Sequence, residues 1–222
     1  MLRAGLTGGL GSGKTMVAAM FRSLGAHVIE ADAVGREMMT PGHAVYDEII
    51  RQFGPGVVRA DGLLDRRHLA DLAFRQNRLA ELNRIVHPPV IAAQQQWADA
   101  IFAHEPDAVA IVESALIFEA DRQGSAPGWR RRFDRVILVT APIEMRVARY
   151  VDRMASLPGA PSKPELEADA RRRITAQIPD EEKIPLSDFV IRNDDSMEAT
   201  RLQVEGVYAE LAGASKAQAR NL

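Results

Sequence analysis

Short apolar runs recur along the chain and predict five β-strands. They lie at residues 3–7, 27–30, 108–113, 135–140 and 188–192. The first, third and fourth runs are apolar almost throughout, which is typical of parallel strands that are covered on both faces. Segments with helical spacing separate the runs. This alternation predicts an α/β fold with a doubly wound, five-stranded parallel sheet and right-handed crossovers.

The stretch from 34 to 105 is far longer than one crossover between strands needs, and its pattern predicts several helices. Leu69, Leu72 and Ala73 fall on one helical face. At residues 87–89 the sequence His-Pro-Pro predicts a break, because proline disfavours helix at the residue before it. A further helix is expected to run to about His104. We therefore expect a helical insertion that carries a second binding site.

Two further segments depart from the strand–helix alternation. Residues 154–165 contain three prolines and a glycine and are expected to form a mobile cover over the site. Residues 213–222 lack apolar periodicity and are expected to be a loose tail.

Composition narrows the class of protein. The 222 residues contain no cysteine, which excludes disulfides and agrees with a reducing cytosol. A net charge of −2 argues against broad nucleic-acid binding. No apolar run approaches the roughly 20 residues of a membrane span, and we expect no signal peptide. These features favour a cytoplasmic protein that binds neither nucleic acid nor membrane.

Residues 8–15 read GGLGSGKT and fit the phosphate-binding pattern G-x-x-x-x-G-K-S/T completely. Glycines allow backbone conformations in which successive N–H groups surround a phosphate chain. Lys14 is placed to reach the β- and γ-phosphates, and the Thr15 hydroxyl to ligate Mg²⁺. A strand precedes the pattern and a helix follows it, so a chance glycine-rich turn explains it less well. We expect a nucleoside triphosphate to bind at Gly8, Gly9, Leu10, Gly11, Ser12, Gly13, Lys14, Thr15 and Met16.

Two carboxylates follow predicted strands. If the second strand lies beside the phosphate-loop strand, Asp32 ends next to the γ-phosphate, where it can accept or orient the proton of an attacking hydroxyl. The other interpretation, which is compatible with this one, is that Asp32 caps the helix expected to start at Ala33. Glu113 ends the third strand, where an acidic residue can hold Mg²⁺ through water; it can also be an ordinary polar strand end.

Arg146, Arg149 and Arg153 share one face of the helix after the fourth strand. Such a stripe is commonly a solvated surface. Beside a phosphate loop and a proline-rich cover, however, arginines can neutralise the charge that develops during phosphoryl transfer. This context favours a functional role for Arg149 and Arg153.

Other conspicuous clusters receive structural interpretations. The arginines at 130–132 are expected to form a solvated turn, and those at 171–173 a helix surface. His87, before two prolines, is expected to be a structural cap. The five histidines show no metal-ligand spacing.

Together these motifs resemble the dephospho-coenzyme A kinase family. The order is GGLGSGKT, Asp32 within E-A-D-A-V-G-R, Phe53-Gly54, D-G-L-L-D-R-R-H-L from Asp61, His87-Pro88, and L-I-F-E from Leu116. Later segments agree as well: Arg149 and Arg153, Ala176-Gln177, and D-F-V-I-R-N from Asp188. The phosphate loop is shared by many enzymes, whereas the combination with the other segments is much more specific.

The resemblance implies that ATP, with Mg²⁺, phosphorylates the ribose 3′-hydroxyl of dephospho-coenzyme A, the last step of coenzyme A synthesis. It implies that Asp32 takes the hydroxyl proton, with Lys14 and Thr15 on phosphate and Mg²⁺ and Arg149 over the transferred group. Arg36, His87 and Leu116 would lie near the acceptor, and Arg153, Gln177 and Asn193 near ATP.

From these motifs we divide the chain into four parts. The nucleotide-binding core comprises 1–33, 106–145 and 178–213. The helical acceptor-binding part is 34–105, the lid region 146–177, and the loose tail 214–222. A monomer or weak homo-oligomer is expected.

The chain departs from the family pattern in its acceptor segment. E-S-A-L-I-F-E replaces the usual D-x-P-L-L-F-E, so that Glu113 and Ala115 stand for Asp and Pro. The longer Glu113 side chain can still reach a Mg²⁺-bound water. Met16 stands where a second hydroxyl residue is common.

Three other functions remain open at this level. Another small-molecule or nucleoside kinase would share the fold and the phosphate loop. A GTP-dependent switch would need N-K-x-D, which is absent. A non-catalytic nucleotide-binding subunit is disfavoured by the intact Lys14, Thr15 and Asp32.

Overall fold

The computed structural model describes residues 1–76 and 78–219 and contains the expected parallel sheet. Its five strands begin or end within one residue of the predicted runs. They are β1 (Leu2–Thr7), β2 (His27–Glu30), β3 (Val109–Glu113), β4 (Arg135–Thr140) and β5 (Phe189–Arg192). All neighbouring strands are parallel. The predicted fold class is confirmed.

The order of the strands corrects one expectation. The sheet runs β2-β3-β1-β4-β5, so β3 lies between β2 and the phosphate-loop strand β1. The assumption that β2 lies beside β1 is wrong. The long helical connection after β2 leads into β3, and β3 occupies the place between β2 and β1. In the register of the sheet, Glu113 pairs with both Leu6 of β1 and Glu30 of β2. Glu113 is therefore the strand-end carboxylate beside the phosphate-loop strand.

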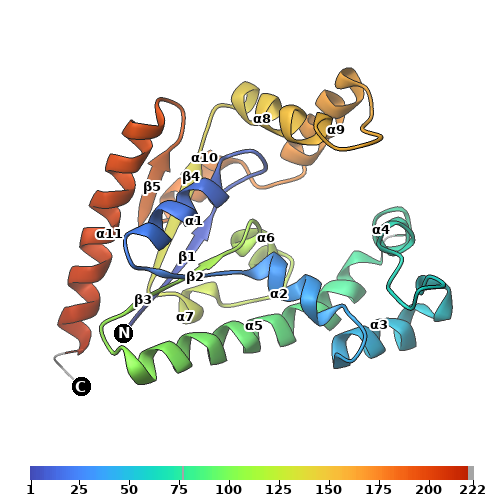
Figure 1. Cartoon of the computed structure of the whole chain (residues 1–222), viewed down its shortest axis with the longest axis horizontal. Helices are drawn as coiled ribbons and strands as arrows, with labels where there is room; N and C mark the ends of the chain where they lie inside the picture. Colours follow the sequence, from blue (N-terminus) through green and yellow to red (C-terminus); the bar gives the residue numbers. More distant parts are fainter. Residues whose placement is uncertain (77, 220–222) are drawn as a thin grey trace.

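Helices cover both faces of the sheet, which explains its apolar strands (Figure 1). On one face, α1 (Lys14–Ser23) and α11 (Met197–Ala219) pack together over residues such as Leu2, Ala4 and Leu6. On the other face, α6 (Ile117–Arg122) and α7 (Trp129–Arg132) pack over Val112 and Val136.

The stretch from 34 to 105 is helical, as predicted, but the expected break is absent. It contains α2 (Ala31–Met38), α3 (Ala44–Phe53), a 3₁₀ turn (Pro55–Val57), α4 (Arg66–Arg75) and α5 (Leu79–His104). Helix α5 runs through Pro88 and Pro89 for 26 residues. The prolines remove two backbone donors. Packing of α5 against α2, α3 and α4 keeps the helix continuous instead.

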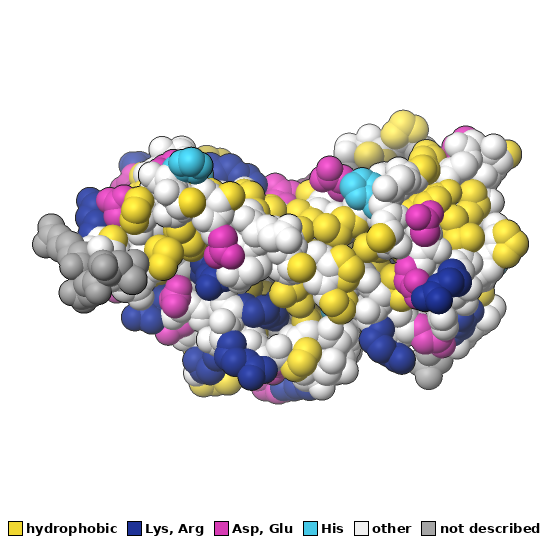
Figure 2. Space-filling model, turned by 90° about the horizontal axis from the view of Figure 1, so that it is seen from below, with side chains coloured by type: hydrophobic (Ala, Val, Ile, Leu, Met, Phe, Trp, Pro, Cys, Tyr) yellow, Lys and Arg dark blue, Asp and Glu magenta, His cyan; other side chains and the backbone are white. Residues whose placement is uncertain are grey.

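Apolar side chains hold the helical part together separately from the sheet. The α4 face predicted from Leu69 and Leu72 packs on Val45 and Ile49 of α3. Figure 1 shows α3 and α4 at one end of the molecule, away from the strands. Viewed from below, this part forms the smaller lobe on the right, and apolar side chains gather where it joins the rest (Figure 2).

The proline-rich segment connects two helices that pack against each other. These are α8 (Ile143–Ala155) and α9 (Lys163–Thr175), which share a small core of Val147, Tyr150 and Leu166. Ser162 and Glu165 form a reciprocal capping box at the start of α9. The connection itself exposes Leu157 by 52%. The chain continues through α10 (Asp180–Lys183) and a second 3₁₀ turn (Ile184–Leu186).

The C-terminal segment contradicts the expected loose tail. Helix α11 continues to Ala219, and residues 220–222 lie outside the described part. Leu211 and Ser215 are buried, and the Ser215 hydroxyl donates to the Ala108 carbonyl over 2.8 Å. Small residues near Gly213 obscure the apolar period while allowing this close packing. In the part of the chain that is described, no helix has the length and apolar character of a membrane span.

Candidate active site

The phosphate loop connects the carboxyl end of β1 to the first residue of α1. Gly11 and Gly13 have φ values of 74° and 95°, a region that favours glycine. A Cβ at Gly11 would also collide with the Arg146 backbone, and one at Gly13 with the Asn193 amide. The loop therefore needs glycine at both positions, for backbone angle and for space.

Side chains from distant segments hold the loop carbonyls on its outer side. Arg146 Nε donates to Leu10 O over 2.9 Å, and Asn193 Nδ2 to Ser12 O over 2.8 Å. Gln177 Oε1 accepts from the Leu10 N–H over 2.9 Å. Arg149 donates to the carbonyls of Ser12 and Asn193 over 3.4 and 3.0 Å. The loop is thus fixed in shape before a ligand binds, which reduces the cost of ordering it.

Three charged groups occupy the carboxyl edge of the sheet next to this loop. Burial lowers the pKa of Lys14, and the negative charges of Glu113 and Asp32 oppose that shift. Burial raises the pKa of the half-buried Glu113, and the positive charge of Lys14 opposes it. Lys14 Nζ lies 3.5 Å from the Gly9 carbonyl. A cation and two carboxylates therefore converge where a triphosphate would end.

Asp32 is exposed in the first turn of α2, and the alternative that it caps this helix is wrong. The helix begins at Ala31, its N-cap residue is Glu30, and no side chain makes a capping hydrogen bond. The Asp32 carboxylate is free of a structural hydrogen bond within the described chain.

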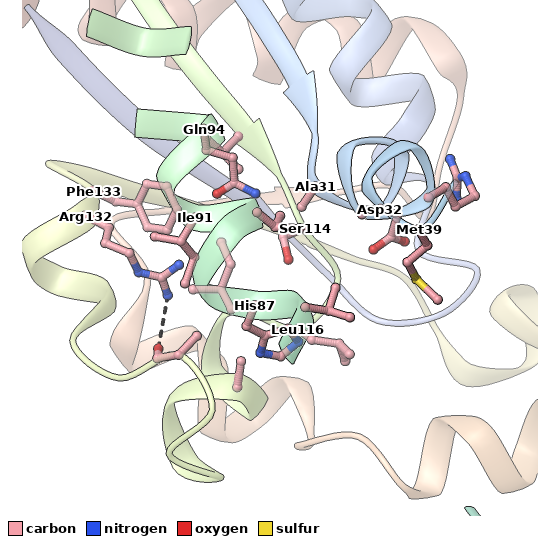
Figure 3. Close-up of a pocket in the computed structure, with 18 of the residues that line it drawn as sticks. Ala31, Asp32, Met39, His87, Ile91, Gln94, Ser114, Leu116, Arg132 and Phe133 are labelled. Carbon is pink, nitrogen blue, oxygen red and sulfur yellow. Dashed lines mark hydrogen bonds between the residues drawn. The ribbon is translucent and has the colours of Figure 1, made fainter. Parts of the chain in front are cut away.

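A cavity of about 440 Å³ opens beside Asp32, between α2, α5 and the segment after β3. All four residues predicted to bind the acceptor line it: Asp32, Arg36, His87 and Leu116. Figure 3 shows Asp32 on one side and His87 and Leu116 at its lower edge. Apolar side chains, including Val90 and Ile91, form much of its wall. The cavity has the size and character of a small-molecule site.

His87 lies within α5 and is not the predicted cap. Its Nδ1 is buried and has no hydrogen-bond partner in the described structure. Burial lowers the pKa of His87, and the positive charge of Arg132 lowers it further. A hydrogen bond to the Ser125 backbone acts in the opposite direction and raises the pKa. Burial thus disfavours the charged form of the imidazole beside the cavity.

The arginine stripe on α8 divides into two kinds of residue. Arg146 is buried and Arg149 half-buried against the phosphate loop, so the solvated-face interpretation is wrong for both. Arg153 is exposed, with its guanidinium 5.8 Å from the Tyr150 ring centroid, and is not brought to the loop. Its role toward ATP stays a prediction.

The basic triplets also behave differently. The arginines at 171–173 are exposed, as predicted. Arg130 and Arg131 are exposed, but Arg132 is half-buried and lines the cavity, so the solvated-turn interpretation is wrong there.

A buried charge network behind the phosphate loop is not predicted from the sequence. Lys183 Nζ lies 2.7 Å from Glu119 Oε1, and both side chains are almost fully buried. Glu119 Oε1 also accepts from the Ile178 N–H over 3.2 Å. Next to this pair, Arg146 contacts Asp180 over 3.3 Å. Glu119 ends the L-I-F-E segment, but that motif does not indicate its burial, and no local pattern marks Asp180 or Lys183.

Metal ligands are sparse at this edge. The described residues contain no group of three or more His, Cys, Asp or Glu side chains suited to a metal.

Comparison with known proteins identifies the family. The model of the dephospho-CoA kinase family matches residues 2–199. The dephospho-CoA kinase of Aquifex aeolicus is 36% identical over 212 residues, covering 95% of this chain and 98% of the relative. That of Moorella thermoacetica is also 36% identical and covers 95% and 92%.

Solved structures agree. The crystal structure of TT1252 from Thermus thermophilus is 34% identical, has a TM-score of 0.73, and covers 95% of this chain and 97% of that one. Dephospho-CoA kinase from Campylobacter jejuni, at 21% identity and a TM-score of 0.65, shares the fold over 96% and 98% of the two chains. On the family match and the full-length relatives, this chain belongs to the dephospho-CoA kinase family.

Proposed function

We propose that this chain transfers the γ-phosphoryl group of ATP to the ribose 3′-hydroxyl of dephospho-coenzyme A. The products are coenzyme A and ADP, and the reaction is the last step of coenzyme A biosynthesis. The observation that carries the proposal is a cavity that opens beside Asp32, whose negative charge also acts on Lys14 of an intact phosphate loop. Full-length similarity to dephospho-CoA kinases supports this acceptor over the nucleosides of other kinases.

On the donor side, residues 8–16 surround the ATP phosphates with those backbone N–H groups that are not already bonded, as that of Leu10 is to Gln177, and Lys14 neutralises charge on the β- and γ-phosphates. Desolvation of Lys14 strengthens its field at the phosphates because less water screens it. The hydrogen bonds that Arg146, Gln177 and Asn193 make to the phosphate loop hold its backbone in one conformation.

On the acceptor side, Asp32 orients the 3′-hydroxyl and takes its proton as the bond to phosphorus forms. The oxygen attacks the γ-phosphorus while the bond to the β-phosphate oxygen breaks, and ADP leaves. Arg36, His87 and Leu116 shape the entrance in which the acceptor lies. Arg149, which donates to the Ser12 carbonyl of the loop over 3.4 Å, neutralises charge on the transferred group.

The residues present fit Mg²⁺. The exposed Thr15 hydroxyl can be a direct ligand, and Glu113 can hold a metal-bound water. Bound there, the ion would screen the charge of the β- and γ-phosphates. A metal would also return the raised pKa of Glu113 toward its ordinary value, because a cation favours the carboxylate.

The predicted division of the chain, without the loose tail, completes the proposal. Residues 34–105 hold the acceptor, and residues 146–177 form a lid that excludes water from the reacting phosphoryl group. Closing this lid would bring Arg153 toward ATP. The enzyme works in the cytoplasm as a monomer or weak homo-oligomer.

A coupled ADP-release assay with purified protein, ATP and Mg²⁺ tests the function. Dephospho-coenzyme A should stimulate release far more than adenosine, other nucleosides, nucleoside monophosphates or shikimate-like alcohols, and the product should be phosphorylated at the 3′ position. Stimulation chiefly by a nucleoside would favour another small-molecule kinase. A preference for GTP over ATP would favour a GTP-dependent switch protein. Absence of any phosphoryl transfer would favour a non-catalytic nucleotide-binding subunit.

A further inference from the structure

The acceptor cavity has an inner end that the reaction described so far does not use. We define the inner end as Ile91, Gln94, Arg132 and Phe133, which line both this cavity and a small hollow adjoining it. Figure 3 shows these four residues together on the side away from Asp32 and Met39. At the other end, Met39 and Arg66 connect the cavity to a second one.

Gln94 is the unusual residue of the inner end. It is the first of three consecutive glutamines in α5 and the only buried one of the three, at 7% exposure. Gln95 is exposed and bonded to Asp99, and Gln96 is exposed. The Gln94 carboxamide makes no hydrogen bond within the described chain. The amide faces the cavity, so its donor and acceptor are both available to a polar group of a ligand there (Figure 3).

The surroundings of Gln94 suit a flat, mostly apolar group. Phe133 is 7% exposed, and its ring packs where a Cβ at Gly5 would lie, so glycine in β1 makes room for this wall. The Arg132 guanidinium lies 5.3 Å from the Phe133 ring centroid, and its Nε is buried without a partner. Arg132 also donates to the Ala126 carbonyl over 3.2 Å. The inner end thus offers an aromatic ring, aliphatic contacts and a few unpaired donors and acceptors.

We propose that the inner end binds the adenine of the acceptor and that Gln94 recognises its 6-amino group. Adenine presents an amino donor beside a ring-nitrogen acceptor, and a carboxamide offers the complementary acceptor and donor. Phe133 provides an aromatic contact for the base, as in other base-binding sites. Arg36 and Arg66, at the other end of the cavity, are exposed and can bind the diphosphate of the acceptor. The diphosphate keeps more of its hydration at this exposed end. This assignment rests on the proposed function.

The test compares two acceptors and three proteins. The acceptors are dephospho-coenzyme A and its analogue with hydrogen in place of the 6-amino group. The proteins are the unaltered chain, Gln94→Leu and the matched control Gln96→Leu. The quantity is the ratio of kcat/KM values for the two acceptors. Removing one partner of a buried neutral hydrogen bond leaves the other unpaired, so the unaltered chain should prefer the 6-amino acceptor about tenfold.

Gln94→Leu should reduce this ratio to within about twofold of unity, whereas Gln96→Leu should keep it. If Gln94→Leu does not fold, Gln94→Met, which keeps the length of the side chain, serves in the same comparison. An unchanged ratio in the Gln94 variant, or no preference in the unaltered chain, would overturn the assignment. Failure of the unaltered chain to phosphorylate dephospho-coenzyme A itself would instead overturn the proposed function.

Discussion

The Glu119–Lys183 pair should be a large determinant of stability, and the structure allows the effect to be separated from other contacts. Lys183 has no exposed surface, and the Glu119 side chain is 6% exposed. Breaking a buried pair by removing one partner leaves an uncompensated charge and costs about 3–5 kcal/mol. For a chain of this size each kcal/mol lowers Tm by about 2–4 °C, so Glu119→Gln or Lys183→Met should lower Tm by roughly 6–20 °C.

Thermal and urea unfolding measure this effect. Glu119→Gln retains an oxygen that can accept the Ile178 N–H, so its cost reports on the charge rather than on that hydrogen bond. The double variant Glu119→Gln/Lys183→Met removes both charges and should be more stable than either single variant. The exposed pair Arg122–Glu182 is also 2.7 Å apart, and Glu182→Gln should cost less than about 1 kcal/mol. Single variants that cost no more than Glu182→Gln, or a double variant that loses their sum, would refute the reasoning.

Four further predictions concern the site. Lys14→Ala should nearly abolish turnover with little change in Tm, because it removes the cation at the β- and γ-phosphates; normal turnover in the ADP-release assay would contradict the phosphate site. Asp32→Asn should lower kcat by roughly 10²–10⁴-fold. Because Asp32 is exposed and caps no helix, the unfolding midpoint of this variant should stay unchanged; lost stability with normal kcat would speak against a catalytic role. Arg149→Ala should lower kcat more than it raises the KM for ATP, and hydrogen exchange at 154–165 should slow when an ATP analogue and acceptor bind together; equal exchange with and without ligands would argue against a lid. Burial lowers the pKa of His87 in the folded chain below the unfolded value of about 6.5, so the unfolded chain binds the proton first and the free energy of unfolding should fall as pH drops below about 6.5. His87→Asn should reduce this fall between pH 7.5 and 5.5, measured by urea unfolding at the two pH values. An equal fall in the variant would contradict the assignment.

The sequence predicts the strands and the phosphate loop well because both rest on local signals. A continuous apolar run and a glycine pattern can each be recognised within ten residues. The structure has the strands and the phosphate loop at the positions that these patterns predict. The position of β3 between β2 and β1 is a property of the whole sheet that no local pattern encodes. The proline pair in α5 shows the limit of a local rule, since packing overrides the tendency of His87-Pro88 to end a helix.

For the site, residue type and position could be predicted when a motif carried them, as for Lys14 and Asp32. The partners that hold the loop were harder to find. Arg146 belongs to the arginine stripe on α8, but nothing near it in the sequence predicts that its side chain is buried against Leu10. Gln94 and Lys183 gave no signal because burial of a single polar residue is decided by elements far away in the chain.

The outer contacts of the phosphate loop have a consequence for synthesis of the chain. The loop occupies residues 8–15, yet its carbonyls are held by Arg146, Arg149 and Asn193. A nascent chain has the complete motif on leaving the ribosome, but the groups that fix its shape are translated more than a hundred residues later. Nucleotide affinity should therefore arise only when β5 joins the sheet, and a fragment that ends before Asn193 would carry the signature without the binding. ATP binding at this enzyme should therefore report that the last strand has been added.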